Sequence, residues 1–427
     1  GKFHNIFWAK IVFFPMKFSY FCKEKNNVFT HTFINFITLI IVEIVFNINQ
    51  LSFIILIFFI VAWLIQMMYY WGLFSRLAFH KKEEKNTNYE AVSVIVCARD
   101  AQEYLIDLIP TLLSQDYPDY EIVIVNDCSQ DNTEEYLKDM ARNNPKISLV
   151  NLTQSLNFFH GKKFPLSMGI KSAKHDLLLL TDADCLPNTN QWIKEMVGTY
   201  RKDTEIVVGY GPYFERKGLL NKLIRFDTLY IAMQYMSLAL AKKPYMGVGR
   251  NLSYRKNTFI KNKGFTSHYN IPSGDDDLFI SQVANKKNTR VAIDAINRIE
   301  SEPKKTWATW VRQKKRHYST GTKYKPQINF ILGMLLCSRL LYYPTLIALF
   351  IMPHAFNISL GNIYYYITLG FFALTHYITM FVIYHKSAKQ LGEKHLALAF
   401  TPLYDCFFML FTTILGMWST FFKPKGW

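Results

Sequence analysis

The sequence predicts an α/β domain with a mostly parallel sheet, set between apolar segments long enough to cross a membrane. Between residues 81 and 327, short β-branched runs alternate with segments of helical character, a pattern typical of parallel strands joined by helices. Outside that region the chain has long stretches with few or no charged residues. About 20 such residues are enough for one membrane-spanning helix.

Residues 1–80 are expected to form an N-terminal membrane region, a hairpin with spans near 32–46 and 51–74. The segment 51–74 has no charged residue, and few helices of soluble proteins are apolar on every face. The segment 32–46 is shorter and carries Glu43, which is costly at the centre of a bilayer. A second span and a buried helix therefore both stay open for 32–46.

Residues 81–327 are expected to form a cytosolic domain. Its strands are expected at 91–97, 121–126, 147–152, 175–181 and 206–210, and its helices at 101–113, 132–142, 164–173 and 219–241. Continuous apolar runs rich in β-branched residues are typical of strands buried on both faces. Ligands bind beyond the carboxyl ends of such strands, where Asp127 and Asp182 are expected.

Residues 328–427 are expected to form a C-terminal membrane region of about three spans, at 328–352, 363–384 and 396–422. The last of these carries Asp405. Lysines follow the first membrane region, precede the second and lie between its last two spans, at positions 81, 82, 85, 314, 315, 323, 325, 386, 389 and 394. Positive loops stay inside, so we predict an integral protein of a bacterial-type inner membrane with its central domain in the cytosol.

The amino-acid composition limits the kinds of molecule that the protein is expected to bind. The net charge is +17, but the basic residues gather beside the apolar spans, which suits anionic lipids and diphosphates better than nucleic acid. The six cysteines form no Cys-x-x-Cys pair, so neither a zinc site nor a disulfide scaffold is expected. We therefore expect the lipid bilayer as a partner and no nucleic acid.

Acidic residues follow the strand expected at 175–181. Asp182 and Asp184 alternate along an extended segment, which lets both side chains face the same side. Paired carboxylates hold hard divalent cations such as Mg²⁺ or Mn²⁺, and such a cation neutralises the charge that develops on a departing diphosphate. A nucleotide sugar is the donor that needs this chemistry.

A third acidic group, Asp275, Asp276 and Asp277, lies further along the chain. An acceptor hydroxyl must lose its proton as it attacks a sugar, so one of these carboxylates is expected to be a general base. Crowded carboxylates raise one another's pKa, which suits proton transfer. The sequence by itself leaves the choice among the three open.

The order of these groups, followed by Gln313-Lys314-Lys315-Arg316-His317, resembles the membrane-embedded branch of the family 2 glycosyltransferases. The resemblance covers residues 91 to about 318 and implies a GT-A fold that binds nucleotide sugars. Gly247–Arg255 resembles the glycine-bearing strand that lies beside the acceptor in that family. His317 stands where the family has Trp, which leaves processivity and acceptor class open.

The resemblance also implies roles for individual residues. Asp184 would be the main metal ligand, Asp182 would touch the metal or the ribose, and Asp276 would be the base with Asp275 beside it. Donor-binding roles fall on Asp127, Asp182, Lys162, Gln313, Arg316 and His317. Two of these residues have plainer alternatives: Asp127 could lie in a turn that caps a helix, and Lys162 could be a surface lysine. A helix near 305–320 with Trp307 and Trp310 also fits an amphipathic segment at the membrane interface.

Together these observations predict an inverting, metal-dependent hexosyl- or N-acetylhexosaminyl-transferase. It would use a UDP- or GDP-linked sugar and a lipid-linked or polysaccharide acceptor at the cytosolic membrane face. A polyprenyl-phosphate sugar transferase and a processive polysaccharide synthase are alternatives, although the former generally lack the Gln-x-x-Arg motif. An inactive transferase-like membrane scaffold is a more distant one. The sequence does not identify partner subunits.

Overall fold

The computed structural model describes residues 50–153, 161–271, 273–355 and 363–421. The span expected at 32–46 lies outside these residues. The chain divides into two compact units. One holds the described residues up to 64 together with those between 340 and 376, and the other holds 65–339 with those from 377 onward.

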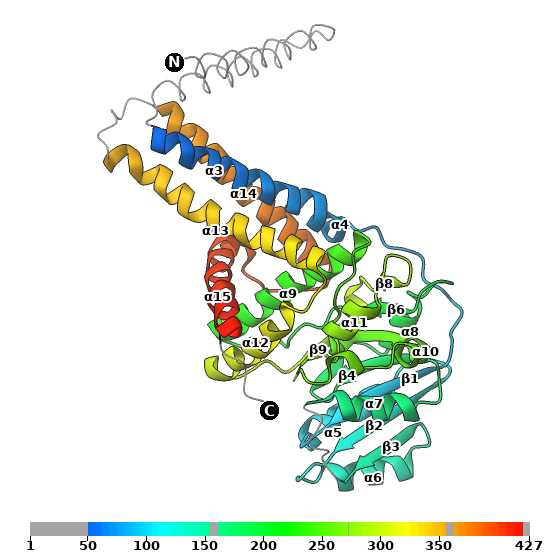
Figure 1. Ribbon diagram of the computed structural model, residues 1–427. Coiled ribbons are helices and arrows are strands. Elements are labelled where there is room, and N and C mark those ends of the chain that lie inside the picture. The colour runs from blue at the N-terminus through cyan, green and yellow to red at the C-terminus, as the bar shows by residue number, and fades with distance from the viewer. Residues whose placement is uncertain (1–49, 154–160, 272, 356–362, 422–427) are drawn as a thin grey trace, which may run out of the picture. The chain divides into compact units, whose positions relative to one another are not determined.

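The larger unit is built on a seven-stranded sheet with the order β3-β2-β1-β4-β7-β6-β8. Its strands are β1 (Val92–Ala98), β2 (Tyr120–Asp127), β3 (Ile147–Leu152), β4 (Leu177–Asp182), β6 (Ile206–Val208), β7 (Leu252–Arg255) and β8 (Thr289–Val291). Strands β3, β2, β1 and β4 pair in parallel, and β7 runs antiparallel to both of its neighbours. The predicted, mostly parallel α/β sheet is confirmed (Figure 1).

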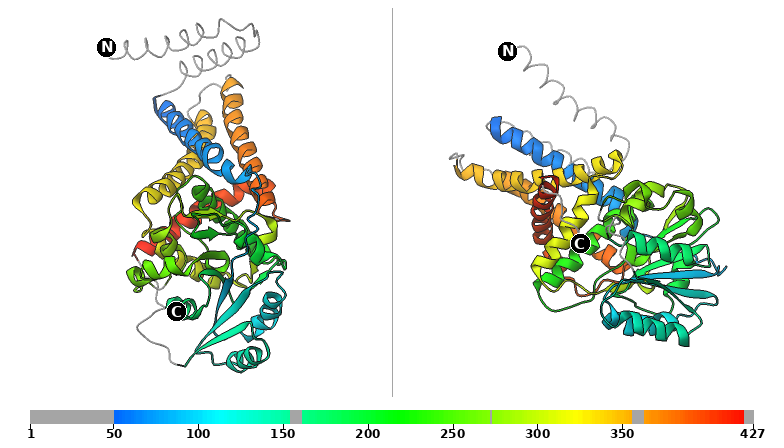
Figure 2. Two further views of the ribbon diagram at one scale, coloured as in Figure 1. Left: turned by 90° about the vertical axis from the view of Figure 1, so that its right-hand side faces the viewer. Right: turned by 60° about the horizontal axis from the view of Figure 1, so that its bottom comes forward.

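Helices cover both faces of this sheet because successive strand residues point to opposite sides. Val94, Val96 and Ile122 pack with α5 (Gln102–Leu113), α6 (Thr133–Asn143) and α8 (Trp192–Val197). Ile95 and Val123 share the other hydrophobic core with α7 (Lys163–Ser172), α9 (Leu219–Leu240) and α11 (Asp277–Val283). Figure 2 shows helices on both sides of the twisted sheet.

Shorter elements complete the larger unit. They are α4 (Ser75–Ala78), α10 (Lys256–Lys261), the 3-10 turns η2 (Gly249–Asn251), η3 (Thr266–His268), η4 (Ala295–Asn297) and η5 (Leu398–Phe400), and the antiparallel pair β5 (Cys185–Pro187) and β9 (Ile299–Ser301). Helix α12 (Trp307–Gly321) follows β9 and packs along α15 (Thr401–Phe421). Between α3 (Gln50–Met67) and α4 the chain forms one π-helical segment, η1 (Met68–Phe74).

Among the described residues, four helical stretches are long and apolar enough to cross a membrane: Phe53–Ala78, Pro326–Ile351, Tyr365–Gln390 and Leu398–Trp418. They belong to α3 and its continuation, α13 (Pro326–Ala355), α14 (Ile363–Gln390) and α15. In the smaller unit, Phe59 stacks on Tyr342 at 5.3 Å, and the Trp63 indole N–H donates to the Phe372 carbonyl at 3.2 Å.

The acidic residue in the last candidate span has a partner. Asp405 of α15 forms a buried ion pair with Arg339 of α13, and Arg339 also donates to the Tyr230 hydroxyl at 2.6 Å. Buried charges are tolerated when they are paired and hydrogen-bonded. Asp405 is therefore compatible with a membrane-spanning α15.

Candidate active site

The carboxyl ends of β1, β2 and β4 bring distant acidic residues to one edge of the sheet. Cys97 of β1 lies opposite Asp182 of β4 in the parallel register, and Asp127 ends β2 on the other side of β1. Burial raises the pKa of the Cys97 thiol to about 12, and the charges of Lys162, Asp182, Asp275 and Asp127 all act on it. All four charges are therefore close enough to the end of β1 to influence the Cys97 thiol.

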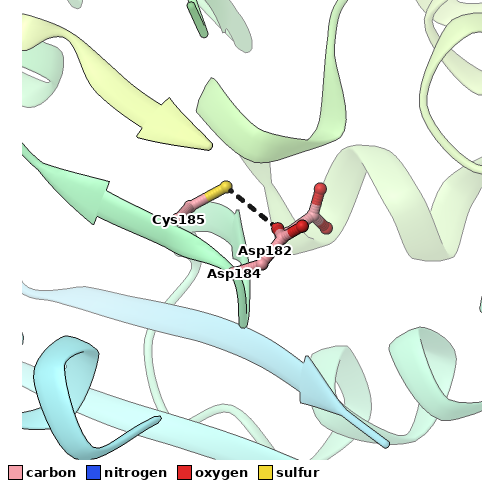
Figure 3. Close-up of side chains that lie close together, drawn as sticks. All are labelled: Asp182, Asp184 and Cys185. Carbon is pink, nitrogen blue, oxygen red and sulfur yellow. Dashed lines mark hydrogen bonds between the residues drawn. The ribbon is translucent and has the colours of Figure 1, made fainter. Parts of the chain in front are cut away.

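Asp182 and Asp184 lie on the turn from β4 to β5 with Cys185 beside them (Figure 3). One potential ligand atom from each of the three residues lies within 4.8 Å of the others. Burial raises the pKa of the Asp184 carboxyl, and the negative charge of Asp182 raises it further. The Asp184 Oδ1 accepts from the Cys185 thiol at 3.5 Å and from the Ser301 hydroxyl of β9 at 3.4 Å.

The side chains that could act as metal ligands here suit a hard divalent cation. Mg²⁺ and Mn²⁺ prefer oxygen ligands, which both carboxylates supply. A cation would relieve the repulsion between Asp182 and Asp184. Burial raises the pKa of Cys185 well above its usual value, so its sulfur stays protonated and is unsuited to a hard cation. The Asp182 side chain is 39% exposed to solvent, so a ligand can reach it.

Two adjacent lysines at the start of α7 have different environments. The ammonium of Lys162 pairs with the Asp182 carboxylate, and this charge outweighs the effect of burial and lowers the pKa of Asp182. Lys163 instead donates to the carbonyls of His268, Ile271 and Ser273, at 2.6, 2.6 and 2.8 Å. Lys163 thus fixes the loop that precedes Asp275, while Lys162 faces the carboxylates.

The structure separates the three consecutive aspartates at the start of α11. Asp276 accepts from the backbone N–H of Gly249 and of Asp277, both at 2.7 Å. Burial and the charges of Asp275 and Asp277 nevertheless raise the pKa of Asp276 to about 7. A carboxylate with such a pKa is suited to accept a proton near neutral pH.

Asp277 has a different set of partners. Its Oδ2 accepts from the Thr320 hydroxyl at 2.5 Å and from the Tyr324 hydroxyl at 2.7 Å. Its Oδ1 accepts from the Leu278 N–H at 2.7 Å. These bonds connect α11 to the C-terminal end of α12. Both carboxylate oxygens of Asp277 therefore take part in hydrogen bonds that stabilise the fold.

The turn η2 connects the acidic groups. Gly249 binds Asp276 through its N–H, and the next residue, Arg250, exerts its positive charge on Asp182 and Asp184. Arg250 is held in place because its Nε donates to the Gly211 carbonyl at 2.6 Å and its guanidinium lies 4.5 Å from the Tyr213 ring centre. A Cβ on Gly211 would lie 2.5 Å from that guanidinium, so only glycine fits there.

The three motif residues of α12 approach the same region. Gln313 donates to the Tyr213 hydroxyl at 3.2 Å, and Arg316 contributes positive charge at Asp182. His317 keeps solvent contact, yet the surrounding protein and the charges of Lys314, Arg316, Arg250 and Lys304 lower its pKa well below the usual value. A neutral imidazole is therefore expected at His317 near pH 7.

Asp127 sits in a turn that is bonded to the turn after β1. Its Oδ2 lies 3.9 Å from the Arg99 guanidinium, and burial raises its pKa. The two turns are joined by the Ser129 hydroxyl, which accepts from the Asp100 N–H at 3.0 Å, and by Asp100, which accepts from the Gln130 N–H at 2.7 Å. Asp100 and Ser129 therefore hold the two turns together.

Sequence reasoning missed part of this arrangement. The sequence patterns assign no role to Arg250, which lies in the glycine-bearing segment 247–255, nor to Tyr213 or Lys304. An arginine between a glycine pair and an asparagine, in the strand expected beside the acceptor, was the available signal for Arg250. The functional roles of the predicted site residues remain predictions; the structure reports only where each lies.

Comparison with known proteins points to one family. Residues 93–262 match the family model Glycosyl transferase family 2, and residues 180–385 match the model Glycosyl transferase family group 2. A Haemophilus influenzae protein named as an uncharacterized glycosyltransferase is 29% identical over 128 residues, which is 30% of this chain and 38% of that protein. The poly-β-1,6-N-acetyl-D-glucosamine synthase of Staphylococcus epidermidis is 31% identical over 132 residues, 30% of each chain.

Among solved structures, the chain is similar to a mannosyltransferase from Pyrobaculum calidifontis in complex with GDP-Man and Mn²⁺. The TM-score is 0.52 at 17% identity, covering 80% of this chain and 99% of that one. With the family matches, this likeness confirms the predicted GT-A-type fold. The matched segments span 38% and 30% of the two curated relatives, well under half of each.

Proposed function

Because the chain belongs to the family 2 glycosyltransferases, we propose that it transfers a hexose or N-acetylhexosamine, with inversion, from a nucleotide sugar to a lipid-linked or polysaccharide acceptor. The observation that carries this proposal is the grouping of Asp182, Asp184 and Lys162 at the carboxyl end of β4, beside the ends of β1 and β2, where β2 ends at Asp127. Four stretches of the described chain that suit a bilayer support transfer at a membrane, and the lysines beside them favour its cytosolic face.

The donor would lie at the carboxyl edge of β1, β2 and β4. Asp127 would meet the nucleoside, with Arg99 3.9 Å from it. Asp182 and Asp184 would hold Mg²⁺ or Mn²⁺, which, when bound, neutralises charge on the departing diphosphate. Lys162, Arg250 and Arg316 add positive charge in the same place, and fixed charges of this kind stabilise a developing anion without reorganising.

Asp276 would accept the proton of the acceptor hydroxyl as that oxygen attacks the anomeric carbon. The N–H groups of Gly249 and Asp277 orient its carboxylate. Asp275, beside it, would help to keep its pKa near 7. One displacement at the anomeric carbon inverts its configuration. The proton leaves on Asp276 and the nucleoside diphosphate leaves with the bonding electrons.

Two comparisons guide the choice of donors. The Staphylococcus epidermidis relative is a poly-N-acetylglucosamine synthase, which supports UDP-GlcNAc and a polysaccharide product. The Pyrobaculum calidifontis protein binds GDP-Man with Mn²⁺, which supports testing GDP-linked sugars as well. A processive synthase is therefore the second candidate, and product length distinguishes it from single transfer.

The test uses the full chain in lipid nanodiscs with a panel of UDP- and GDP-sugars, Mg²⁺ or Mn²⁺, and mixed membrane lipids. We expect release of nucleoside diphosphate from one donor, incorporation of labelled sugar into a lipid or polymer fraction, and loss of both in excess chelator. Asp184→Asn should lose turnover and weaken Mn²⁺ binding in the presence of the nucleoside diphosphate. Folded protein that turns over no donor would refute the proposed transferase, and full activity in chelator would refute the role given to Asp184.

A further inference from the structure

The loop between α14 and η5 is seated in the large unit through a buried carboxylate. This docked loop, residues 391–396, carries Glu393, whose side chain is 1% exposed. The Glu393 Oε1 accepts from the Tyr210 hydroxyl at 2.9 Å, and its Oε2 accepts from the Arg225 guanidinium at 2.7 Å. Both hydrogen bonds involve a charged group, which makes them stronger than neutral ones.

The backbone of the docked loop packs closely against neighbouring residues of the large unit. Gly392 has φ +71°, and a Cβ there would lie 2.7 Å from the Cβ of Ala295. Its carbonyl accepts from Arg298, and the carbonyl of Lys394 accepts from Arg225 at 2.6 Å. These contacts are independent of one another, and together they hold the docked loop in one specific position.

Tyr210 belongs to the same segment that holds the candidate active site. Its carbonyl accepts from the Asn251 side chain at 2.7 Å, and the next residue, Gly211, accepts from Arg250 at 2.6 Å. Asn251 and Arg250 lie in η2 with Gly249, whose N–H binds Asp276 at 2.7 Å. Glu393 is thus joined to the candidate base through Tyr210 and η2.

We propose that Glu393 is a positioning residue: it holds Tyr210, and through it the η2 turn that places Asp276 and Arg250. The loop between two candidate membrane spans would in this way help to set the geometry of the active site. This inference rests on the proposed function. Apolar packing would suffice to attach the loop, whereas a carboxylate also fixes the position of the Tyr210 hydroxyl.

Tyr210→Phe tests the proposal most cleanly, because it removes the hydroxyl and leaves the ion pair between Arg225 and Glu393 intact. In nanodisc-reconstituted full chain we expect kcat to fall about 10- to 100-fold, since small displacements of a reacting group cost this much. The donor Kd should change less than kcat, because of the groups placed at the donor only Arg250 lies in η2. Glu393→Gln should behave in the same way.

Two further variants sharpen the result. The double variant Tyr210→Phe/Glu393→Gln should lose little more kcat than the worse single variant, since both changes weaken the contact between Tyr210 and Glu393, while the added loss of the Arg225 ion pair should appear in the melting temperature. Lys394→Ala is the matched control: its side chain is exposed and only its backbone carbonyl is used, so kcat should stay unchanged.

The outcomes separate the possibilities. If Tyr210→Phe keeps wild-type kcat, or lowers only the melting temperature, the contact merely attaches the loop and the proposal is wrong. If Glu393→Gln fails to fold, Tyr210→Phe still decides. A wild-type protein without turnover refutes the proposed function and this inference together, whereas an active wild type with unaffected variants refutes the inference alone.

Discussion

At the scale of single residues, hydrogen-bond partners separate carboxylates that look alike in the sequence. Asp276 and Asp277 are neighbours, yet Asp277 accepts from two hydroxyls while Asp276 accepts only backbone N–H groups in the described contacts. The pKa of Asp276 is raised to about 7. Consecutive acidic residues are therefore divided between holding α11 in place and the proposed catalysis.

This division predicts a pH dependence. A base must be deprotonated to accept a proton, so kcat/KM should be lost as pH falls through about 7 and reach a plateau above it. Asp276→Asn should lower kcat about 100- to 10,000-fold, the usual contribution of a general base. Initial rates between pH 5.5 and 9 at saturating metal ion measure both effects.

The neighbouring carboxylate supplies the comparison. Asp277→Asn should chiefly lower stability, by about 1–3 kcal/mol, because hydrogen bonds to a charged acceptor are weakened. The variant should stay active, with its pH profile shifted toward lower pH, because the charge of Asp277 no longer raises the pKa of Asp276. An Asp276→Asn protein that binds donor and turns over normally would mean that another group is the base.

At the scale of elements, the sequence predicted the strands and helices around the site closely. The strand expected at 147–152 is β3, and the helix expected at 219–241 is α9, one residue shorter. Apolar periodicity is strong in such segments because each buries a continuous face. The three-residue strands β5 and β9 were missed, since pairs this short are formed by tertiary contacts and leave no periodicity.

Helix α12 is anchored by a buried charge pair that the sequence did not reveal. Lys314, expected to lie on an interfacial face, forms an ion pair with Asp227 of α9, and the two side chains are 8% and 4% exposed. Gln313, Arg316 and His317 belong to the same helix. The pair thus sets where α12 presents its motif.

Breaking this pair should be costly. Lys314→Met leaves the Asp227 carboxylate buried without its partner, which typically costs about 3–5 kcal/mol. Adding Asp227→Leu should recover most of that loss, because two apolar side chains replace the pair. Thermal unfolding of the reconstituted variants gives the comparison.

The control is the adjacent lysine. The Lys315 ammonium lies 3.7 Å from the centre of the Trp418 ring, so Lys315→Met should lose only about 0.5–1 kcal/mol. If Lys314→Met and Lys315→Met lowered the stability equally, the buried pair of Lys314 and Asp227 would not be what anchors α12.

At the scale of the whole molecule, a buried ion pair joins two of the candidate membrane-spanning helices, α13 and α15. Asp405 and Arg339 lie in two different candidate spans and have side chains only 0% and 3% exposed. Charged residues within a membrane are expensive unless paired with one another. The pair therefore specifies how α13 and α15 associate within their unit.

Asp405→Leu should leave Arg339 without its counter-charge and reduce the amount of folded protein sharply, by about 3–5 kcal/mol of stability. Arg339→Leu together with Asp405→Leu should restore most of it. Monodisperse protein recovered from membranes by size-exclusion chromatography measures the effect, with Cys406→Ser as a control beside Asp405. Failure of the double variant to recover would show that Arg339 is needed for more than neutralising Asp405.

The sequence by itself determined the alternation of strands and helices, the apolar spans, and the acidic groups at strand ends. Each of these is written in local periodicity or in a short motif. Only the tertiary structure decided that Asp277 accepts from two hydroxyls while Asp276 accepts from backbone N–H groups, that the charge of Arg250 acts on Asp182, and that Glu393 reaches Tyr210. The reason is physical: a side chain's pKa and partners depend on groups brought close by folding, and Glu393 lies 183 positions along the chain from Tyr210.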